Sequence, residues 1–132
     1  MLTAEDLEFL RRPLHGFLTV ADGPVRPVWF EAAGDGTVQL FTPKDSPKVR
    51  KLSGDPRASI VVAAPVGERE RWVSVAGSAT VEPDGAHELA ARLAERYWNL
   101  EDPALAGELA GIQSLDLVRL VIRPEKVSRY SM

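Results

Sequence analysis

Residues 71–82, RWVSVAGSATVE, alternate apolar and polar side chains along almost their whole length. Successive side chains of a β-strand point to opposite faces, so this pattern predicts a long strand with one buried face. Val73, Val75, Ala79 and Val81 share that face, and Trp72, Ser74, Ser78 and Thr80 share the other. Gly77 interrupts the alternation, and it predicts a bulge or a bend at the corner of a barrel.

Five more runs have the composition of strands, at residues 16–21, 25–32, 37–42, 57–64 and 115–127. Turn residues at 22–24 and 34–36 join the first three runs, so we expect these runs to form an antiparallel meander. Pro27 lies inside the second run and predicts an edge strand or a bulge there, because proline cannot donate to a ladder.

Four short helices are expected around the strands. They are predicted at 3–12, from Ser46 to Gly54 or Asp55, around 86–97, and around 103–110. Six strands with mostly short connections and a few flanking helices predict a mainly β fold, a small antiparallel barrel that is closed or partly open. The length of 132 residues fits one such domain, spanning 1–132.

Composition excludes several classes of function. No apolar run approaches the roughly 20 residues of a membrane helix, and MLTAEDLEFLRR lacks the pattern of a signal peptide, so we expect a cytoplasmic protein without a membrane partner. The chain has no cysteine and only His15 and His87, which argues against a metal site. A net charge of -3 argues against broad nucleic-acid binding and favours a small anion at one local basic cluster.

That cluster is FTPKDSPKVRKL, residues 41–52. Ser46 followed by Pro47 is typical of a helix cap and first helical position, which leaves the backbone N–H groups of Lys48 and Val49 free. The positive end of a helix binds anions, and Thr42 adds a hydroxyl from the preceding strand. The alternative interpretation is a simple serine cap followed by a solvated basic helix face.

The cluster holds further cations in Lys44, Arg50 and Lys51. Arg50 and Lys51 project about 100° apart around the helix, so they cannot both face the same ligand atom. One of them is expected to meet solvent or the tail of a longer anion.

The order of GPVRPVWFE, LFTPKDSPKVRKL, DPRASIVV and RWVSVAGSATVE resembles the pyridoxamine 5'-phosphate oxidase-like, flavin-binding split β-barrels. Within them it resembles the branch of deazaflavin-dependent (coenzyme F-420) oxidoreductases. The likeness covers about residues 10–82 and, less closely, the last strand, VRLVIRPEKV. It implies a six-stranded antiparallel split barrel and a homodimer with two cofactor sites at the subunit interface.

The resemblance also implies a set of cofactor-binding residues. Its most specific part is an aromatic-Thr-x-x-x-Ser-x-Lys pattern that holds the cofactor phosphate, and the preceding strand borders the cofactor ring. Carried onto this chain, the pattern gives the phosphate to Thr42, Ser46 and Lys48, after Phe41, and the ring side to Pro27, Val28, Trp29 and Phe30. Pro47, Arg50 and Lys51, from the same basic stretch, complete the expected cofactor-binding set. Trp72 is the residue we expect the partner chain to contribute.

Two departures separate the chain from the pyridoxamine phosphate oxidases themselves. Pro27 occupies the place of their ring-strand arginine, and Arg26, one place earlier, is expected on the opposite face. Their C-terminal arginine and histidine motif is missing from IRPEKVSRYSM. Oxidation of pyridoxamine phosphate is therefore not the expected activity.

The remaining hypotheses share one cleft. The dense positive charge suits the polyglutamate tail of the deazaflavin, which favours an oxidoreductase passing a hydride to a small conjugated substrate. An FMN-dependent oxidoreductase and a non-catalytic flavin- or haem-binding protein are the alternatives. Trp29, Trp72 and Trp98 either stack on a ring or anchor the fold, and for Trp98 we favour the anchor.

Overall fold

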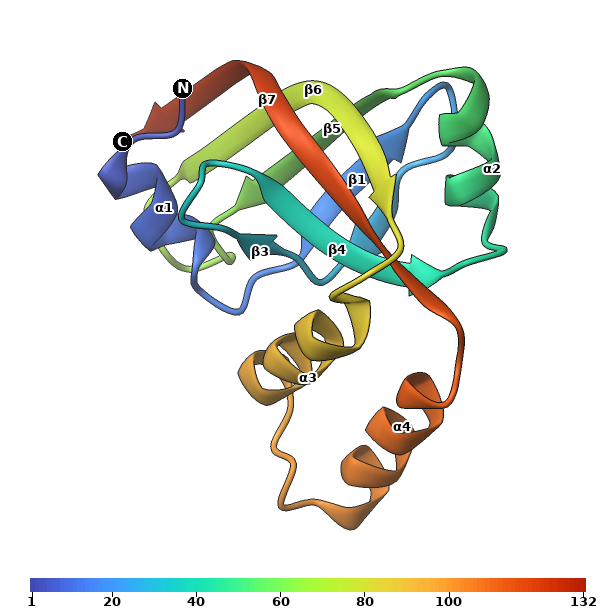
Figure 1. Ribbon diagram of the computed structural model, residues 1–132. Coiled ribbons are helices and arrows are strands. Elements are labelled where there is room, and N and C mark those ends of the chain that lie inside the picture. Colours follow the sequence, from blue (N-terminus) through green and yellow to red (C-terminus); the bar gives the residue numbers. More distant parts are fainter.

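A curled antiparallel sheet organises the protein, seen here in a computed structural model that describes residues 1–132 (Figure 1). Its seven strands follow the order β2-β1-β5-β6-β7-β4-β3. They are β1 (Gly16–Val20), β2 (Arg26–Val28), β3 (Glu31–Ala32), β4 (Val38–Pro43), β5 (Arg57–Ala63), β6 (Arg71–Glu82) and β7 (Leu117–Ser131). The prediction of a mainly β, antiparallel half-barrel is confirmed.

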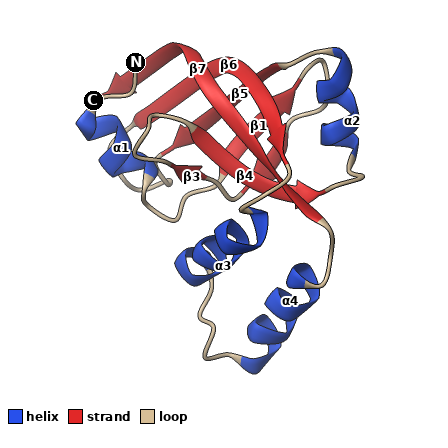
Figure 2. Cartoon of the chain, viewed as in Figure 1, coloured by secondary structure: helices blue, strands red, loops and turns tan.

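Four helices flank this sheet, and all four lie where the sequence predicts them. They are α1 (Ala4–Leu10), α2 (Pro47–Gly54), α3 (Ala86–Tyr97) and α4 (Pro103–Gln113). Helices α1 and α2 lie at opposite ends of the barrel, and α3 and α4 form a hairpin that projects from one side (Figure 2). None of them combines the length and the apolar character needed to cross a membrane.

The predicted strand at 25–32 is wrong, because the structure divides it into β2 and β3. β2 pairs with β1, whereas β3 pairs with β4 at the other edge of the sheet. The break falls at Trp29 and Phe30, and Phe30 is 0% exposed. The chain therefore crosses between the two sheet edges, the strand count is seven instead of six, and β4 continues the sheet through β7 instead of a meander.

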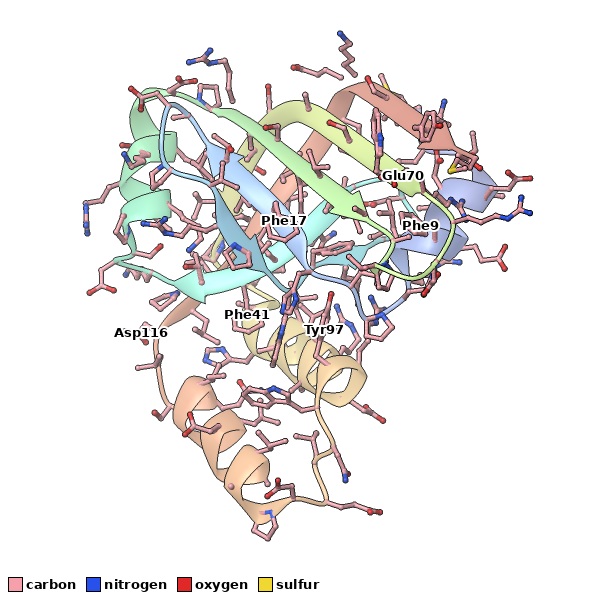
Figure 3. The ribbon with its side chains drawn as sticks, turned by 180° about the vertical axis from the view of Figure 1, so that it is seen from behind. Phe9, Phe17, Phe41, Glu70, Tyr97 and Asp116 are labelled. Atoms are coloured by element: carbon pink, nitrogen blue, oxygen red, sulfur yellow. The ribbon has the colours of Figure 1, made fainter.

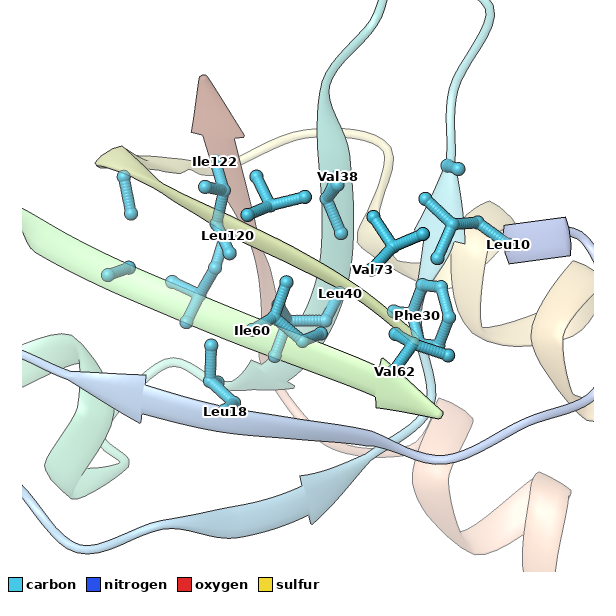
Figure 4. Packing of buried hydrophobic residues seen from close by; sticks show 14 of the residues in the cluster. Leu10, Leu18, Phe30, Val38, Leu40, Ile60, Val62, Val73, Leu120 and Ile122 are labelled. Carbon is cyan, nitrogen blue, oxygen red and sulfur yellow. The ribbon is translucent and has the colours of Figure 1, made fainter. Parts of the chain in front are cut away.

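The core fills the inside of the curl. Side chains from every part of the sheet meet there, including Leu18, Phe30, Leu40, Ile60, Val73 and Leu120 (Figure 4). Gly16 leaves room for this packing, because a Cβ at that position would lie 2.4 Å from Ile60 Cδ1 and 2.9 Å from Phe30 Cδ1. The crossing residue Phe30 is thus part of the core that holds the two edges together.

The predicted irregularity at Gly77 is confirmed. The register between β6 and β7 shifts between Ala76 and Gly77, which marks a bulge in the long strand pair. A Cβ on Gly77 would lie 1.9 Å from the backbone oxygen of Arg123, far inside van der Waals contact. The two strands approach each other too closely at this point for any residue other than glycine.

Gly77→Ala is therefore expected to reduce the free energy of unfolding by about 3 kcal/mol, the upper range for a forced overpacking. Gly107→Ala is the matched control, since a Cβ there meets nothing within 4 Å and helical Gly→Ala stabilises by about 0.5 to 1 kcal/mol. Urea unfolding followed by circular dichroism measures both variants. A Gly77→Ala protein as stable as the parent would contradict the close approach.

Candidate functional site

The junction between β4 and α2 is fixed by two hydroxyl groups. Ser46 precedes α2 in an extended conformation, with Pro47 in the first turn, as the sequence predicts. Its side chain does not cap the helix; instead, Thr42 Oγ1 and Ser46 Oγ lie 3.0 Å apart in a hydrogen bond. Thr42 is 2% exposed, so its side chain sets the position of Ser46 from inside the protein.

The first turn of α2 leaves fewer free donors than the sequence predicts. The backbone N–H of Val49 donates to Ser46 O at 3.1 Å, so the expectation that it is free is wrong. This short-range bond tightens the first turn, as is common at helix ends. The backbone N–H of Lys48 has no partner, and it remains available to a ligand at the positive end of the helix.

A pocket of about 390 Å³, here called the basic pocket, opens beside this helix end. Residues of β1, α2, β2 and the turn before β2 line it: Leu18, Val20, Gly23, Pro24, Arg26, Pro27, Pro47, Lys48 and Lys51. The lining contains three cations and no carboxylate, and none of the three forms an ion pair. Positive charge therefore converges here without compensation.

Arg26 is the residue that the sequence interpretation missed. It is expected on the face opposite the site, but the structure places it in the basic pocket, close enough for its charge to act on Lys48. β2 is only three residues long and lies at the sheet edge, where the alternation of faces constrains a long side chain weakly. Arg26 pairs with Leu18 of β1, which also lines the basic pocket, and this pairing positions Arg26 at the pocket.

Burial lowers the pKa of the Lys48 ammonium, and the positive charge of Arg26 lowers this pKa further. Both effects disfavour the charged form of Lys48. A bound anion would reverse the second effect and stabilise the ammonium. The pocket is thus electrostatically prepared for negative charge.

The other cations of the basic stretch lie apart from one another, and Arg50, expected among the cofactor-binding residues, does not line the basic pocket. Lys51 faces the basic pocket, whereas Arg50 turns back and donates a hydrogen bond to the backbone oxygen of Asp45. Lys44 lies outside the pocket, beside Asp45 and Asp116. Of this stretch, only Pro47, Lys48 and Lys51 therefore line the pocket; the expected phosphate ligands Thr42 and Ser46 do not.

An aromatic cluster lies next to the basic pocket. Trp29 stacks on Tyr97 with ring centroids 5.0 Å apart and an interplanar angle of 9°, and Trp98 meets Trp29 edge-on at 4.6 Å. The ring centroids of Phe41 and Trp29 lie 6.4 Å apart, in an edge-on arrangement. Figure 3 shows Phe41 and Tyr97 at the base of the sheet, on the side of α3.

This cluster borders a second pocket of about 270 Å³, here called the aromatic pocket. Its lining comprises Val28, Trp29, Phe41, Lys48, Trp98 and Ile112. Lys48 lines both pockets and joins them into one continuous candidate site. Trp98 packs on Trp29 as the expected anchor, and it also lines the pocket, so it combines the two roles that the sequence analysis treats as alternatives.

Phe30, expected on the ring side, and Trp72, expected from the partner chain, both lie apart from this site. The side chain of Phe30 belongs to the core, so only its backbone is available to border a ligand. Trp72 lies at the other end of the barrel, where it stacks on Tyr130 with centroids 6.2 Å apart and lines a pocket with α1. Within one chain, Trp72 therefore contributes nothing to the basic or aromatic pocket.

A family model described as pyridoxamine 5'-phosphate oxidase matches residues 2–130, almost the whole length of the structure described above. The chain belongs to this family. The family typically binds FMN or related flavins, which agrees in kind with a basic pocket adjoining an aromatic one. No curated protein matches the chain.

Solved structures place the chain among split barrels of this family. An F420 reductase is 26% identical, with a TM-score of 0.72 and coverage of 92% of this chain and 94% of the other. A conserved hypothetical protein of Mycobacterium tuberculosis is 23% identical (TM-score 0.70; 99% and 85% covered). The heme storage protein HutZ of Vibrio cholerae is 18% identical (TM-score 0.68; 98% and 94% covered). The last two likenesses show the fold alone.

The charge arrangement predicts how Lys48 titrates. Its ammonium should lose its proton below the ordinary value of 10.5, and Arg26→Gln should raise the Lys48 pKa by removing a neighbouring positive charge. Carbon-13 NMR of the Lys48 side chain against pH measures both. Arg50→Gln is the control, because Arg50 faces away and its loss should leave that pKa in place. Equal shifts in the two variants would contradict the geometry.

Proposed function

We propose that the protein is an oxidoreductase that binds the deazaflavin coenzyme F-420 and transfers a hydride to a small conjugated substrate. The observation that carries this proposal is the basic pocket, where Arg26, Lys48 and Lys51 converge unpaired beside the free backbone N–H of Lys48. The structural likeness to an F420 reductase at 26% identity supports the same conclusion.

The residues present fit the anionic part of such a cofactor. Lys48 and its backbone N–H offer donors to a phosphate, while Arg26 and Lys51 extend the positive charge beyond a single phosphate. Hydrogen bonds to charged groups contribute roughly 1.5 to 3 kcal/mol each, so a few of them suffice for micromolar affinity after ordering costs. The additional cations suit the polyglutamate tail that distinguishes the deazaflavin from FMN.

The protein's own contribution to the reaction is position and environment. When bound, the deazaflavin supplies the hydride, and a protein site of this kind needs no acid-base group of its own for that chemistry. Pro27, Val28 and Trp29, at the end of β2 and next to both pockets, would border one edge of the ring. The apolar aromatic walls beyond that edge would keep water away from the ring, which protects a hydride donor from side reactions.

FMN is the alternative cofactor, and a specific observation favours it: the matching family typically binds FMN or related flavins. A non-catalytic flavin- or haem-binding protein would use the same cleft. The visible spectrum of the purified protein separates these functions, since bound FMN is yellow and haem gives a Soret band. Titration with coenzyme F-420 and with FMN then compares the two affinities directly.

We also propose that the protein is a homodimer whose partner chain completes each site. Phe17 and Val61 are directly paired across β1 and β5 on the outer face of the sheet, yet they are 46% and 39% exposed. Tyr130, stacked on Trp72, is 46% exposed. A second copy covering this face would bury these side chains and bring its Trp72 toward the cofactor, as the family resemblance implies.

Lys48→Ala is expected to weaken coenzyme F-420 binding by about 1.5 to 3 kcal/mol, roughly 10- to 150-fold, because a charge-assisted contact is lost. Fluorescence titration measures the affinity. Lys44→Ala removes the same charge outside the basic pocket and should bind nearly as tightly as the parent. Unchanged affinity in Lys48→Ala would sink the phosphate assignment. Failure of both cofactors to bind below about 100 μM would remove the cofactor proposal itself.

Val61→Glu is expected to convert the dimer into monomers and to weaken cofactor binding, because a charge would be buried in the interface. Analytical ultracentrifugation gives the mass, and the same titration gives the affinity. Val66→Glu is the control, since Val66 is fully exposed in a loop and should tolerate the charge. A parent protein that sediments as a monomer would refute the proposed assembly.

A further inference from the structure

The chemistry of the aromatic pocket is unusually one-sided. Five of its lining side chains are apolar or aromatic, and Lys48 supplies its only charge. It offers a ligand no carboxylate, hydroxyl or amide side chain, so a sugar or a phosphate ester would lose hydration there without replacement. Such a lining suits a flat, apolar ligand that carries one hydrogen-bond acceptor group.

The walls of this pocket are held in place by contacts outside it. Tyr97 covers one face of Trp29, and the Tyr97 hydroxyl donates to the backbone oxygen of Leu14, two residues before β1. Trp98 meets Trp29 nearly perpendicular, at 85°. The rings are therefore fixed before a ligand arrives, which reduces the ordering cost of binding.

Two of the lining residues come from the α3–α4 hairpin, and the others come from the barrel and α2. Helix α3 fixes the hairpin through buried residues, including Leu89 and Leu93, whereas α4 has no buried residue. Ile112 lies on the half-buried side of α4 that turns toward α3 and the pocket. Ile112 packs against the small cluster of Ala86, Ala90 and Leu117 and lies outside the main core, so a change at Ile112 alters the pocket and leaves the main core in place.

We propose that the aromatic pocket is the substrate site, and that it selects a planar, apolar ring system carrying one anionic group that lies against Lys48. The role of the pocket as a substrate site rests on the proposed oxidoreductase function, whereas its selectivity in binding does not. Lys48 can serve both pockets, because an ammonium has three donors and the Lys48 backbone N–H remains for the cofactor phosphate, with Arg26 and Lys51 beside it for the rest of the anionic chain. Trp98 and Ile112 determine which ring shape fits.

The test compares probes of one shape and different charge on the full chain without cofactor. The probes are 2-naphthoate, 2-naphthamide and the 2-naphthylmethylammonium ion, with affinities measured by calorimetry. We expect the carboxylate to bind at least about tenfold more tightly than the neutral amide, as a charge-assisted bond requires, and the cation to bind weakest. Equal binding of all three would overturn the proposal.

The location is tested by NMR of the indole N–H groups, since the chain has only three tryptophans. The signals of Trp29 and Trp98 should shift with 2-naphthoate, and the signal of Trp72, at the other end of the barrel, should not. A shift confined to Trp72 would overturn the assignment.

Three variants test the selectivity. Ile112→Ala should weaken 2-naphthoate several-fold, whereas Leu105→Ala, on α4 but outside the pocket lining, should not. Lys48→Gln should abolish the preference for the carboxylate over the amide while amide binding persists, and retention of that preference would refute the role of Lys48.

Cofactor titration is run separately: selective naphthoate binding without cofactor binding would support this site and remove the proposed function. Cofactor binding without selectivity for 2-naphthoate would support the proposed function and refute the assignment of the aromatic pocket.

Discussion

The crossing at Trp29 and Phe30 is the constraint on which the rest of the structure depends. It connects β2 and β3, the two edge strands of the sheet, so these two edges are joined by the covalent chain and the buried Phe30, without a ladder between them. The same crossing places the β2 edge next to the end of β4. Lys48, just after β4, consequently lies beside Arg26, and Trp29 lies beside Phe41. One short segment therefore generates both the core and the candidate site.

The distribution of ion pairs gives this site its meaning. At the α1 end of the barrel, Arg129 binds the buried Asp6 at 2.9 Å and Arg12 binds Glu68 at 2.7 Å, so cations there are already satisfied. Hydrogen bonds from Arg129 and Thr3 outweigh the effect of burial and lower the pKa of Asp6. The basic pocket has no such partner, although the chain carries more acidic than basic residues. Three unpaired cations that line one pocket mark a binding site better than the density of charge along the sequence does.

Local signals in the sequence are sufficient to predict most of the secondary structure. The turn from Ser46 into Pro47, the bulge at Gly77 and the four helices each depend on neighbouring residues, and each was predicted correctly. The division of 25–32 was not predictable in this way, because β-favouring residues continue through it and only the path across the sheet breaks the strand. Arg26 and Ile112 were missed for the same reason: their roles depend on segments that are distant in the sequence.

The hairpin of α3 and α4 has a consequence for how such a protein changes over time. It is inserted between β6 and β7, the strand pair with the longest ladder in the sheet, so its two ends are held by a framework that does not rely on α4. Replacement, lengthening or loss of α4 would reshape one wall of a ligand cavity while the barrel folds as before. Exchange of this one surface helix would therefore change the ligand specificity of the protein at a small cost in the stability of the barrel.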